Sequence, residues 1–255
     1  MRRIRVIPSL LIRNGGLVKS IKFKDHQYVG DPINAVKIFN EKEVDEITIL
    51  DISATKERRA PNIAQIAEIA SEAFMPLGYG GGITKIEEIK EILFNGVEKV
   101  ILNSSALHNT ALLTEGSRLF GAQAIVASID VQKNWLGKYK VFSDGGMKNT
   151  GLDPIEFARK MEGCGVGEIL LNSIDRDGTF GGYDLDIIYN ISKSVAIPLI
   201  AIGGASEVAD FKKAIDAGAS AVSAGSFFVY QRPHRAVLIS YPTQKELKKQ
   251  IFSFL

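Results

Sequence analysis

Short apolar runs alternate with longer amphipathic stretches along the chain. The apolar runs are rich in β-branched residues and end in Gly, Asn, Asp or Ser, which is typical of strands buried on both faces of a parallel sheet. We expect strands at residues 5–10, 46–50, 76–79 and 99–102 in the first half, and at 124–129, 168–171, 198–202 and 221–224 in the second.

Helical patterns separate these runs. Asp31 and Asp153 each precede a proline, which is the pattern of a helix N-cap with proline at the first helical position. Eight strand–helix units of about 32 residues each match the size of a closed (βα)8 barrel. The fold class is therefore α/β, a TIM barrel. An open doubly wound sheet is the alternative, and the lack of a GxGxxG strand–helix turn disfavours it.

Several motifs recur 122 residues further on. Asp31-Pro32 returns as Asp153-Pro154, and Pro76-Leu77 returns as Pro198-Leu199. Near the start the separation is 119, and an extra turn around residues 134–138 would absorb the difference. We therefore expect one barrel domain, residues 1–255, built from half-repeats at about 1–122 and 123–245.

Composition narrows the class of protein. Apolar residues make up 45% and charged residues 24%, as in a globular protein. The net charge of +2 favours neither nucleic acid nor a membrane surface as a partner. The single cysteine, Cys164, cannot form an internal disulfide, and no Cys/His cluster predicts a metal. With no signal-peptide pattern, a cytoplasmic location is expected.

Two glycine turns follow strands in equivalent positions of the two halves. Gly80-Gly81-Gly82 and Gly203-Gly204-Ala205 would let backbone N–H groups approach a phosphate, with a helix N-terminus behind it. The next strand ends in Asn103-Ser104 in the first half and in Gly225-Ser226 in the second. This pattern predicts two phosphate sites across the barrel mouth, and hence an elongated ligand with a phosphate at each end.

Acidic side chains and one lysine are expected between the two phosphate sites. Asp130 ends the fifth strand and is the first candidate for acid–base chemistry. Asp51 ends the second strand, and Asp175 follows the sixth; we expect supporting roles for both. Lys19 follows Gly15-Gly16 in a long first loop, from which it could close over an anionic ligand.

Four charges of alternating sign stand at strand starts, which meet at the opposite end of a barrel. Arg5, Glu46, Lys99 and Glu168 begin the first, second, fourth and sixth strands. They could form a closed ring of ion pairs that plugs the barrel bottom.

From Arg5 to about Phe228 the chain resembles the HisF family, the cyclase subunit of imidazole glycerol phosphate synthase. The most specific shared pieces include Leu50-Asp51-Ile52-Ser53-Ala54, Asp175-Arg176-Asp177-Gly178-Thr179 and Gly182-Tyr183-Asp184. The resemblance implies no cofactor. It implies a heterodimer with a glutaminase (HisH-like) subunit that docks on the barrel bottom and frees ammonia. Ammonia would pass the charged ring and react with a bis-phosphorylated aminoimidazole carboxamide nucleotide (PRFAR), giving imidazole glycerol phosphate and AICAR.

The resemblance also implies roles for individual residues. Lys19 matches the family's ligand-clamping lysine, and Asp130 matches one of its two catalytic aspartates. The phosphate contacts that it implies are Gly82, Asn103 and Ser104 at one end and Asp177, Gly178, Gly204, Ala205, Gly225 and Ser226 at the other.

Three positions depart from the family pattern around one site. Leu11 stands where the family has its first catalytic aspartate, Asn172 replaces a usual threonine, and Ile202 replaces a usual serine. A leucine transfers no proton, so Asp130 would need an unconventional partner such as Asp51. The alternative is an ammonia-channelling subunit that serves an amidotransferase in nucleotide-sugar or surface-polysaccharide synthesis. A sugar-phosphate isomerase is a third reading, and Leu11 counts against it as well.

Overall fold

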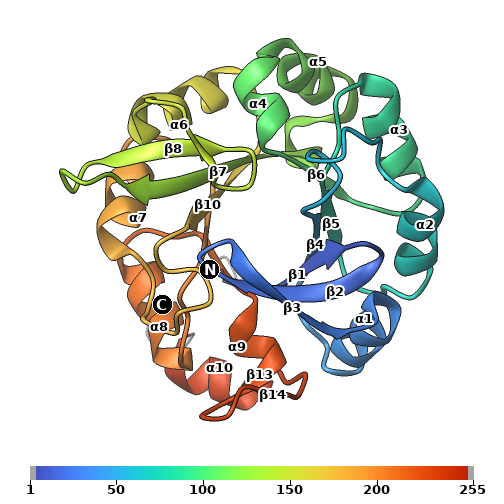
Figure 1. Ribbon diagram of the computed structural model, residues 1–255, viewed down its shortest axis with the longest axis vertical. Helices are drawn as coiled ribbons and strands as arrows, with labels where there is room; N and C mark the ends of the chain where they lie inside the picture. The colour runs from blue at the N-terminus through green and yellow to red at the C-terminus, as the bar shows by residue number, and fades with distance from the viewer. Residues whose placement is uncertain (1–3, 252–255) are drawn as a thin grey trace.

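The computed structural model describes residues 4–251, which form a closed barrel of parallel strands with helices around it (Figure 1). Neighbouring barrel strands pair in parallel in chain order, and pairing of β12 with β1 and of β7 with β10 closes the ring. The predicted barrel is confirmed, and the open-sheet alternative is wrong. The barrel strands are β1 (Arg5–Arg13), β4 (Ile47–Asp51), β5 (Leu77–Gly80), β6 (Lys99–Leu102), β7 (Ile125–Lys133), β10 (Glu168–Ser173), β11 (Leu199–Ile202) and β12 (Ala221–Ala224).

The helices follow the strands and begin where the sequence predicts caps. Asp31 Oδ1 accepts from Asn34 N at 2.9 Å, and Asp153 Oδ1 accepts from Ile155 N at 2.9 Å. Both caps are followed by a proline in the first turn, as expected. The helices are α1 (Pro32–Glu41), α2 (Ile63–Ser71), α3 (Ile86–Phe94), α4 (Ser104–His108), α5 (Thr110–Phe120), η1 (Ala122–Ala124), α6 (Pro154–Gly163), α7 (Leu185–Ser192), α8 (Val208–Asp216), α9 (Ser226–Val229) and α10 (Gln244–Gln250).

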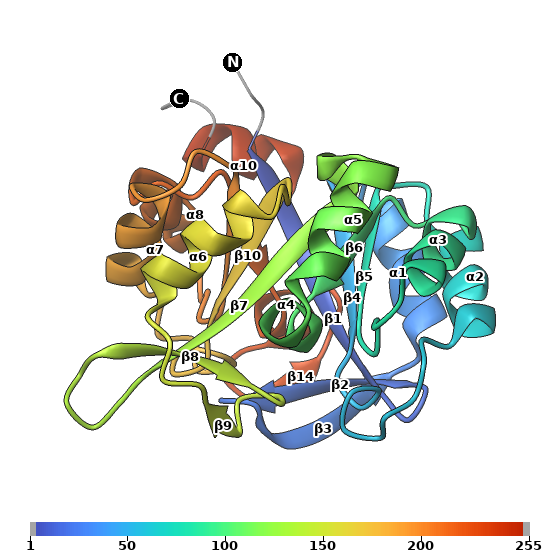
Figure 2. The same cartoon turned by 90° about the horizontal axis from the view of Figure 1, so that it is seen from above.

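Hairpins, which the sequence analysis did not predict, extend the barrel at the end where its strands finish (Figure 2). Strand β1 runs on into β2 (Gly16–Ile21) and β3 (Lys24–Gly30), and β7 runs on into β8 (Tyr139–Ser143) and β9 (Lys148–Asn149). A third pair, β13 (Tyr230–Gln231) and β14 (Ala236–Val237), follows α9.

Two expectations change as a result. Lys19 lies on strand β2, paired with Gln27, so the predicted long first loop is wrong. Asp130 does not end its strand, because β7 continues to Lys133 and pairs with β8. The extra turn expected near residues 134–138 is the tip of the β7–β8 hairpin, where Asn134 N donates to Lys138 O at 2.8 Å.

Apolar side chains pack in two separate clusters. The larger lies between the strands and the helices. The smaller includes Ile7, Val126, Leu170 and Ile200, one from each of four barrel strands, and lies inside the barrel. Successive side chains of a strand point to opposite faces, so alternate residues of every barrel strand share this interior. Within residues 4–251, no helix is long and apolar enough to cross a membrane.

Candidate functional site

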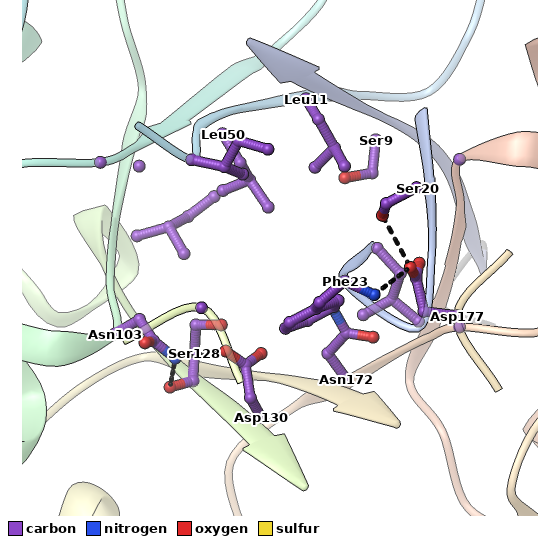
Figure 3. A pocket seen from close by; sticks show the side chains of 18 of the residues that line it. Ser9, Leu11, Ser20, Phe23, Leu50, Asn103, Ser128, Asp130, Asn172 and Asp177 are labelled. Atoms are coloured by element: carbon purple, nitrogen blue, oxygen red, sulfur yellow. Dashed lines mark hydrogen bonds between the residues drawn. The ribbon is translucent and has the colours of Figure 1, made fainter. Parts of the chain in front are cut away.

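A pocket opens where the barrel strands end (Figure 3). Asp175 lies outside this pocket and accepts from Gln132 Nε2 at 3.1 Å and Lys133 N at 2.9 Å, so its expected place between the phosphate sites is wrong. Every other residue that the sequence analysis predicted for phosphate binding or catalysis lines the pocket. These residues are Lys19, Asp51, Gly82, Asn103, Ser104, Asp130, Asp177, Gly178, Gly204, Ala205, Gly225 and Ser226.

Both glycine turns have conformations that exclude a side chain. Gly82 has a φ of +73°, and a Cβ there would lie 2.6 Å from the carbonyl oxygen of Arg59. Gly204 has a φ of +104°, and a Cβ there would lie 2.2 Å from the carbonyl oxygen of Gly182. Because only glycine fits, the main chain at each turn borders the pocket directly.

Asp130 is the most strongly perturbed acid in the pocket. Burial on β7 raises its pKa to about 7, and the charge of Asp177 adds to this effect. A hydrogen bond from Asn103 Nδ2, 3.1 Å from Asp130 Oδ2, opposes it. A carboxyl group that titrates near neutral pH suits proton transfer. The same bond links the acid to Asn103, a residue predicted for the first phosphate site.

Lys19 reaches into the second half of the pocket from β2. Its Nζ donates to Ser9 O at 2.6 Å, and burial lowers its pKa to about 8 while the charge of Asp177 opposes the shift. A Cβ added to Gly225 would lie only 2.8 Å from this Nζ. The lysine therefore lies against the second predicted phosphate site.

The carboxylate of Asp51 bonds to residues of the loop that follows it. Its Oδ1 accepts from the backbone N–H groups of Ser53 and Ala54, both at 3.1 Å, and its Oδ2 lies 2.8 Å from Arg59 Nη2. Asp51 is 5% exposed. This geometry fits the supporting role expected from its strand-end position, because the residue anchors the loop that follows β4.

Asp177 and Gly178 connect the pocket to the first hairpin. Asp177 Oδ2 accepts from Ser20 Oγ at 2.9 Å, and burial raises the pKa of this carboxyl. A Cβ on Gly178 would lie 2.1 Å from the Ser20 carbonyl oxygen. The β2–β3 hairpin is thus fastened to the loop that follows β10.

The centre of the pocket has an apolar wall. Leu11 and Leu50 lie across the cavity from Asp130 (Figure 3), and Ile101 and Ile202 also line it. The side-chain oxygens Ser9 Oγ and Asn172 Oδ1 are buried without a hydrogen-bond partner in the described part of the chain. Leu11 thus gives the pocket an aliphatic surface opposite Asp130.

At the opposite end, the four predicted charges close into a ring. Lys99 Nζ lies 2.9 Å from Glu46 and 2.9 Å from Glu168, and Arg5 is paired with both glutamates. Glu46 is 3% exposed and Glu168 8%. The cluster predicted from strand starts is therefore present as a network of four ion pairs, with the apolar interior between it and the pocket.

Three phenylalanines that line the pocket, Phe23, Phe180 and Phe227, were missed by the sequence analysis. Phe23 in the β2–β3 turn and Phe180 after β10 both line the cavity, with φ values of +62° and +56°. Neither belongs to a periodic pattern. The available signal was the placement of Phe180 directly before Gly181-Gly182 in a loop that follows a strand. No group of three or more His, Cys, Asp or Glu that could hold a metal occurs within residues 4–251.

Comparisons with known proteins agree on one family. The family model described as "Histidine biosynthesis protein" matches residues 5–234. The chain is 50% identical over 248 residues to "Putative imidazole glycerol phosphate synthase subunit hisF2" of Pseudomonas aeruginosa, covering 97% of this chain and 99% of that protein. It is 43% identical over 227 residues to "Imidazole glycerol phosphate synthase subunit HisF" of Alkaliphilus metalliredigens, covering 89% and 90%.

The elevated pKa of Asp130 predicts a pH-dependent stability. The folded chain keeps a proton on this carboxyl up to about pH 7, whereas an unfolded aspartate releases it near pH 4. The stability that the folded chain gains by keeping this proton on Asp130 is fully present at low pH, and it is lost as the pH rises from about 4 to about 7. The free energy of unfolding of the uncharged Asp130→Asn variant should therefore exceed that of the wild type by roughly 1–4 kcal/mol above pH 7. The difference should shrink towards pH 4.

Urea denaturation between pH 4.5 and 8 measures this difference. Glu115→Gln, which changes an exposed carboxylate on α5, is the control and should follow the wild type. A constant difference between Asp130→Asn and the wild type over this range would show that Asp130 has an ordinary pKa.

Proposed function

Because the chain belongs to the HisF family of histidine biosynthesis proteins, we propose that it is the ammonia-receiving subunit of a glutamine-dependent enzyme. Ammonia enters at the charged ring (Arg5, Glu46, Lys99 and Glu168), moves along the barrel interior and reaches the pocket around Asp130. The observation that carries this proposal is the alignment of ring, apolar interior and pocket inside one barrel.

The chemistry of the interior supports passage of a neutral molecule. Most of the side chains between ring and pocket are apolar and come from several strands, among them Ile7, Val126 and Leu170, and the hydroxyl of Thr48 is the uncharged polar group on β4 between Glu46 and Leu50. Transfer of an ammonium ion through such surroundings is costly, whereas ammonia carries no charge. The ring then acts as the entrance that must open, since its four side chains cover the base of the barrel.

Exposed aromatic side chains support a partner at the ring end. Phe74, between α2 and β5, is 83% exposed, and Phe94, the last residue of α3 before the connection to β6, is 89% exposed. These connections approach the same barrel end as Lys99. Large aromatic residues dominate the energetics of many protein interfaces. We therefore assign this end to a glutaminase subunit, in a heterodimer.

The pocket suits a ligand with two phosphate groups. The two glycine turns follow β5 and β11, which are separated by three strands on either side of the ring, so they face each other across the mouth. Asp130 lies between them as general acid or base, and Lys19 contributes a positive charge beside the second turn. If PRFAR is the ligand, the products are imidazole glycerol phosphate and AICAR.

Leu11 favours a second candidate function. Removal of a general acid or base typically lowers a rate by about 10²–10⁴, and the wall of Leu11, Leu50, Ile101 and Ile202 offers no replacement. The second candidate is a subunit that does not cyclise PRFAR but channels ammonia to an amidotransferase of nucleotide-sugar or surface-polysaccharide synthesis. Both candidates share the ring and the axial path, and they differ in the acceptor.

The docking assignment predicts that Phe94→Ser weakens the complex with the glutaminase subunit. Loss of a large aromatic contact should raise the Kd about tenfold or more. Trp135→Ser is the matched control, because Trp135 is 90% exposed but lies on the β7–β8 hairpin at the pocket end. Titration calorimetry measures both. Equal effects of the two substitutions would contradict docking at the ring end.

Ammonia entry through the charged ring predicts that Lys99→Ala lowers the coupling between glutamine hydrolysis and the amination that uses the released ammonia. The measured quantity is the ratio of aminated product to glutamate, which should fall because ammonia is lost to solvent at a damaged entrance. Lys90→Ala, an exposed lysine on α3, is the control. An unchanged ratio in Lys99→Ala would rule out entry through the ring.

The two candidate functions differ in their response to PRFAR and ammonium salt without any glutaminase. Leu11→Asp should increase the rate of PRFAR loss by about 10²–10⁴ if the wild-type cyclase is limited by its missing acid. Leu11→Asn, of similar size but without a titrating group, controls for polarity. Absence of turnover in both the wild type and Leu11→Asp would eliminate the cyclase candidate.

A further inference from the structure

The last hairpin brings two arginines to the second glycine turn. Arg235, just before β14, donates from Nη2 to Gly178 O at 2.8 Å. Arg232, in the same hairpin turn, donates from Nη2 to Ser206 O at 2.7 Å. Gly178 lines the pocket, and Ser206 directly follows Ala205, which also lines it. Each guanidinium group is thus bonded to a loop that borders the second predicted phosphate site, and neither arginine lines the pocket itself.

A pocket residue holds these two cations together. The guanidinium carbons of Arg232 and Arg235 lie 5.2 Å and 5.4 Å from the ring centroid of Phe180. This distance is within the range of cation–π attraction. Phe180 itself lines the pocket. The aromatic ring therefore connects both arginines to the cavity wall.

A third arginine lies at the same turn. Arg176 donates from Nη1 to Gly181 O at 2.9 Å, and its Cβ would lie 3.0 Å from a Cβ placed on Gly204. Within residues 4–251, no carboxylate lies within 4.0 Å of these three guanidinium groups. The two acids next to Arg176 in sequence bond elsewhere, because Asp177 accepts from Ser20 Oγ and Asp175 accepts from Gln132 Nε2 and Lys133 N.

The first glycine turn is different. The arginine beside it, Arg59, pairs with Asp51 at 2.8 Å and with Glu57 at 2.7 Å. Its charge is therefore neutralised within the loop. The two turns share their glycine geometry, but the arginine beside the first is paired with carboxylates, whereas the three arginines near the second are not.

We propose that, in the second candidate function, the second glycine turn binds a diphosphate group, so that this pocket takes an organic diphosphate such as a nucleoside diphosphate in place of a ligand with one phosphate at each turn. One phosphate occupies the turn formed by Gly204 and Ala205, and the adjacent phosphate meets Arg232 and Arg235. Guanidinium groups provide paired N–H donors that match phosphate oxygens. The inference rests on the proposed function, because it names the class of ligand for the same pocket.

Titration calorimetry of the full chain with inorganic phosphate and with pyrophosphate, at one ionic strength, tests the proposal. Arg232→Gln and Arg235→Gln should each raise the Kd for pyrophosphate about tenfold, as expected for a lost charge-assisted hydrogen bond. The Kd for phosphate should change less than about threefold. Arg118→Gln, on α5 away from the pocket, is the matched control and should change neither value.

Unchanged pyrophosphate affinity in both arginine variants would overturn the proposal. Equal weakening of phosphate and pyrophosphate would also overturn it, because the arginines would then serve a single phosphate. The two variants break contacts to different loops, so one remains informative if the other unfolds. Neither titration needs a glutaminase or an ammonia acceptor, so failure here leaves the test of the charged ring unaffected.

Discussion

Closure of the eight-stranded ring is the constraint on which the site depends. Once β12 pairs with β1 and β7 with β10, every second residue of each strand must lie inside. Strand β1 illustrates the result: Arg5 belongs to the charged ring, Ile7 to the apolar interior, and Ser9 and Leu11 to the pocket. A one-residue change of register would exchange these side chains with those facing the helices.

The pocket contains an acid and a base, Asp130 and Lys19, whose pKa values are shifted towards each other. Burial raises the pKa of Asp130 to about 7 and lowers that of Lys19 to about 8. Both shifts have the same cause, because a low-dielectric site disfavours either charged form. The hairpin supplies Lys19 and is fastened through Ser20 and Asp177. The electrostatics of the site therefore depend on a hairpin outside the barrel as well as on the barrel strands.

The barrel and the two glycine turns could be predicted from sequence because their signals are local and repeated. Buried parallel strands are continuous apolar runs, and the turns at Gly82 and Gly204 recur in both halves. The hairpin position of Lys19 and the pairing of Asp51 with Arg59 could not be predicted. Each depends on contacts that no period in the sequence encodes, such as the 2.8 Å ion pair that occupies Asp51.

The charged ring holds more ion pairs than are needed to pair each of its glutamates with one cation. Each of its two glutamates touches both cations, so the four side chains form a cycle of contacts. If Lys99 alone left the ring, Glu46 and Glu168 would both keep Arg5, and no acid would be left alone in a buried position, which would be costly. The arginine by itself therefore suffices to keep both buried glutamates paired.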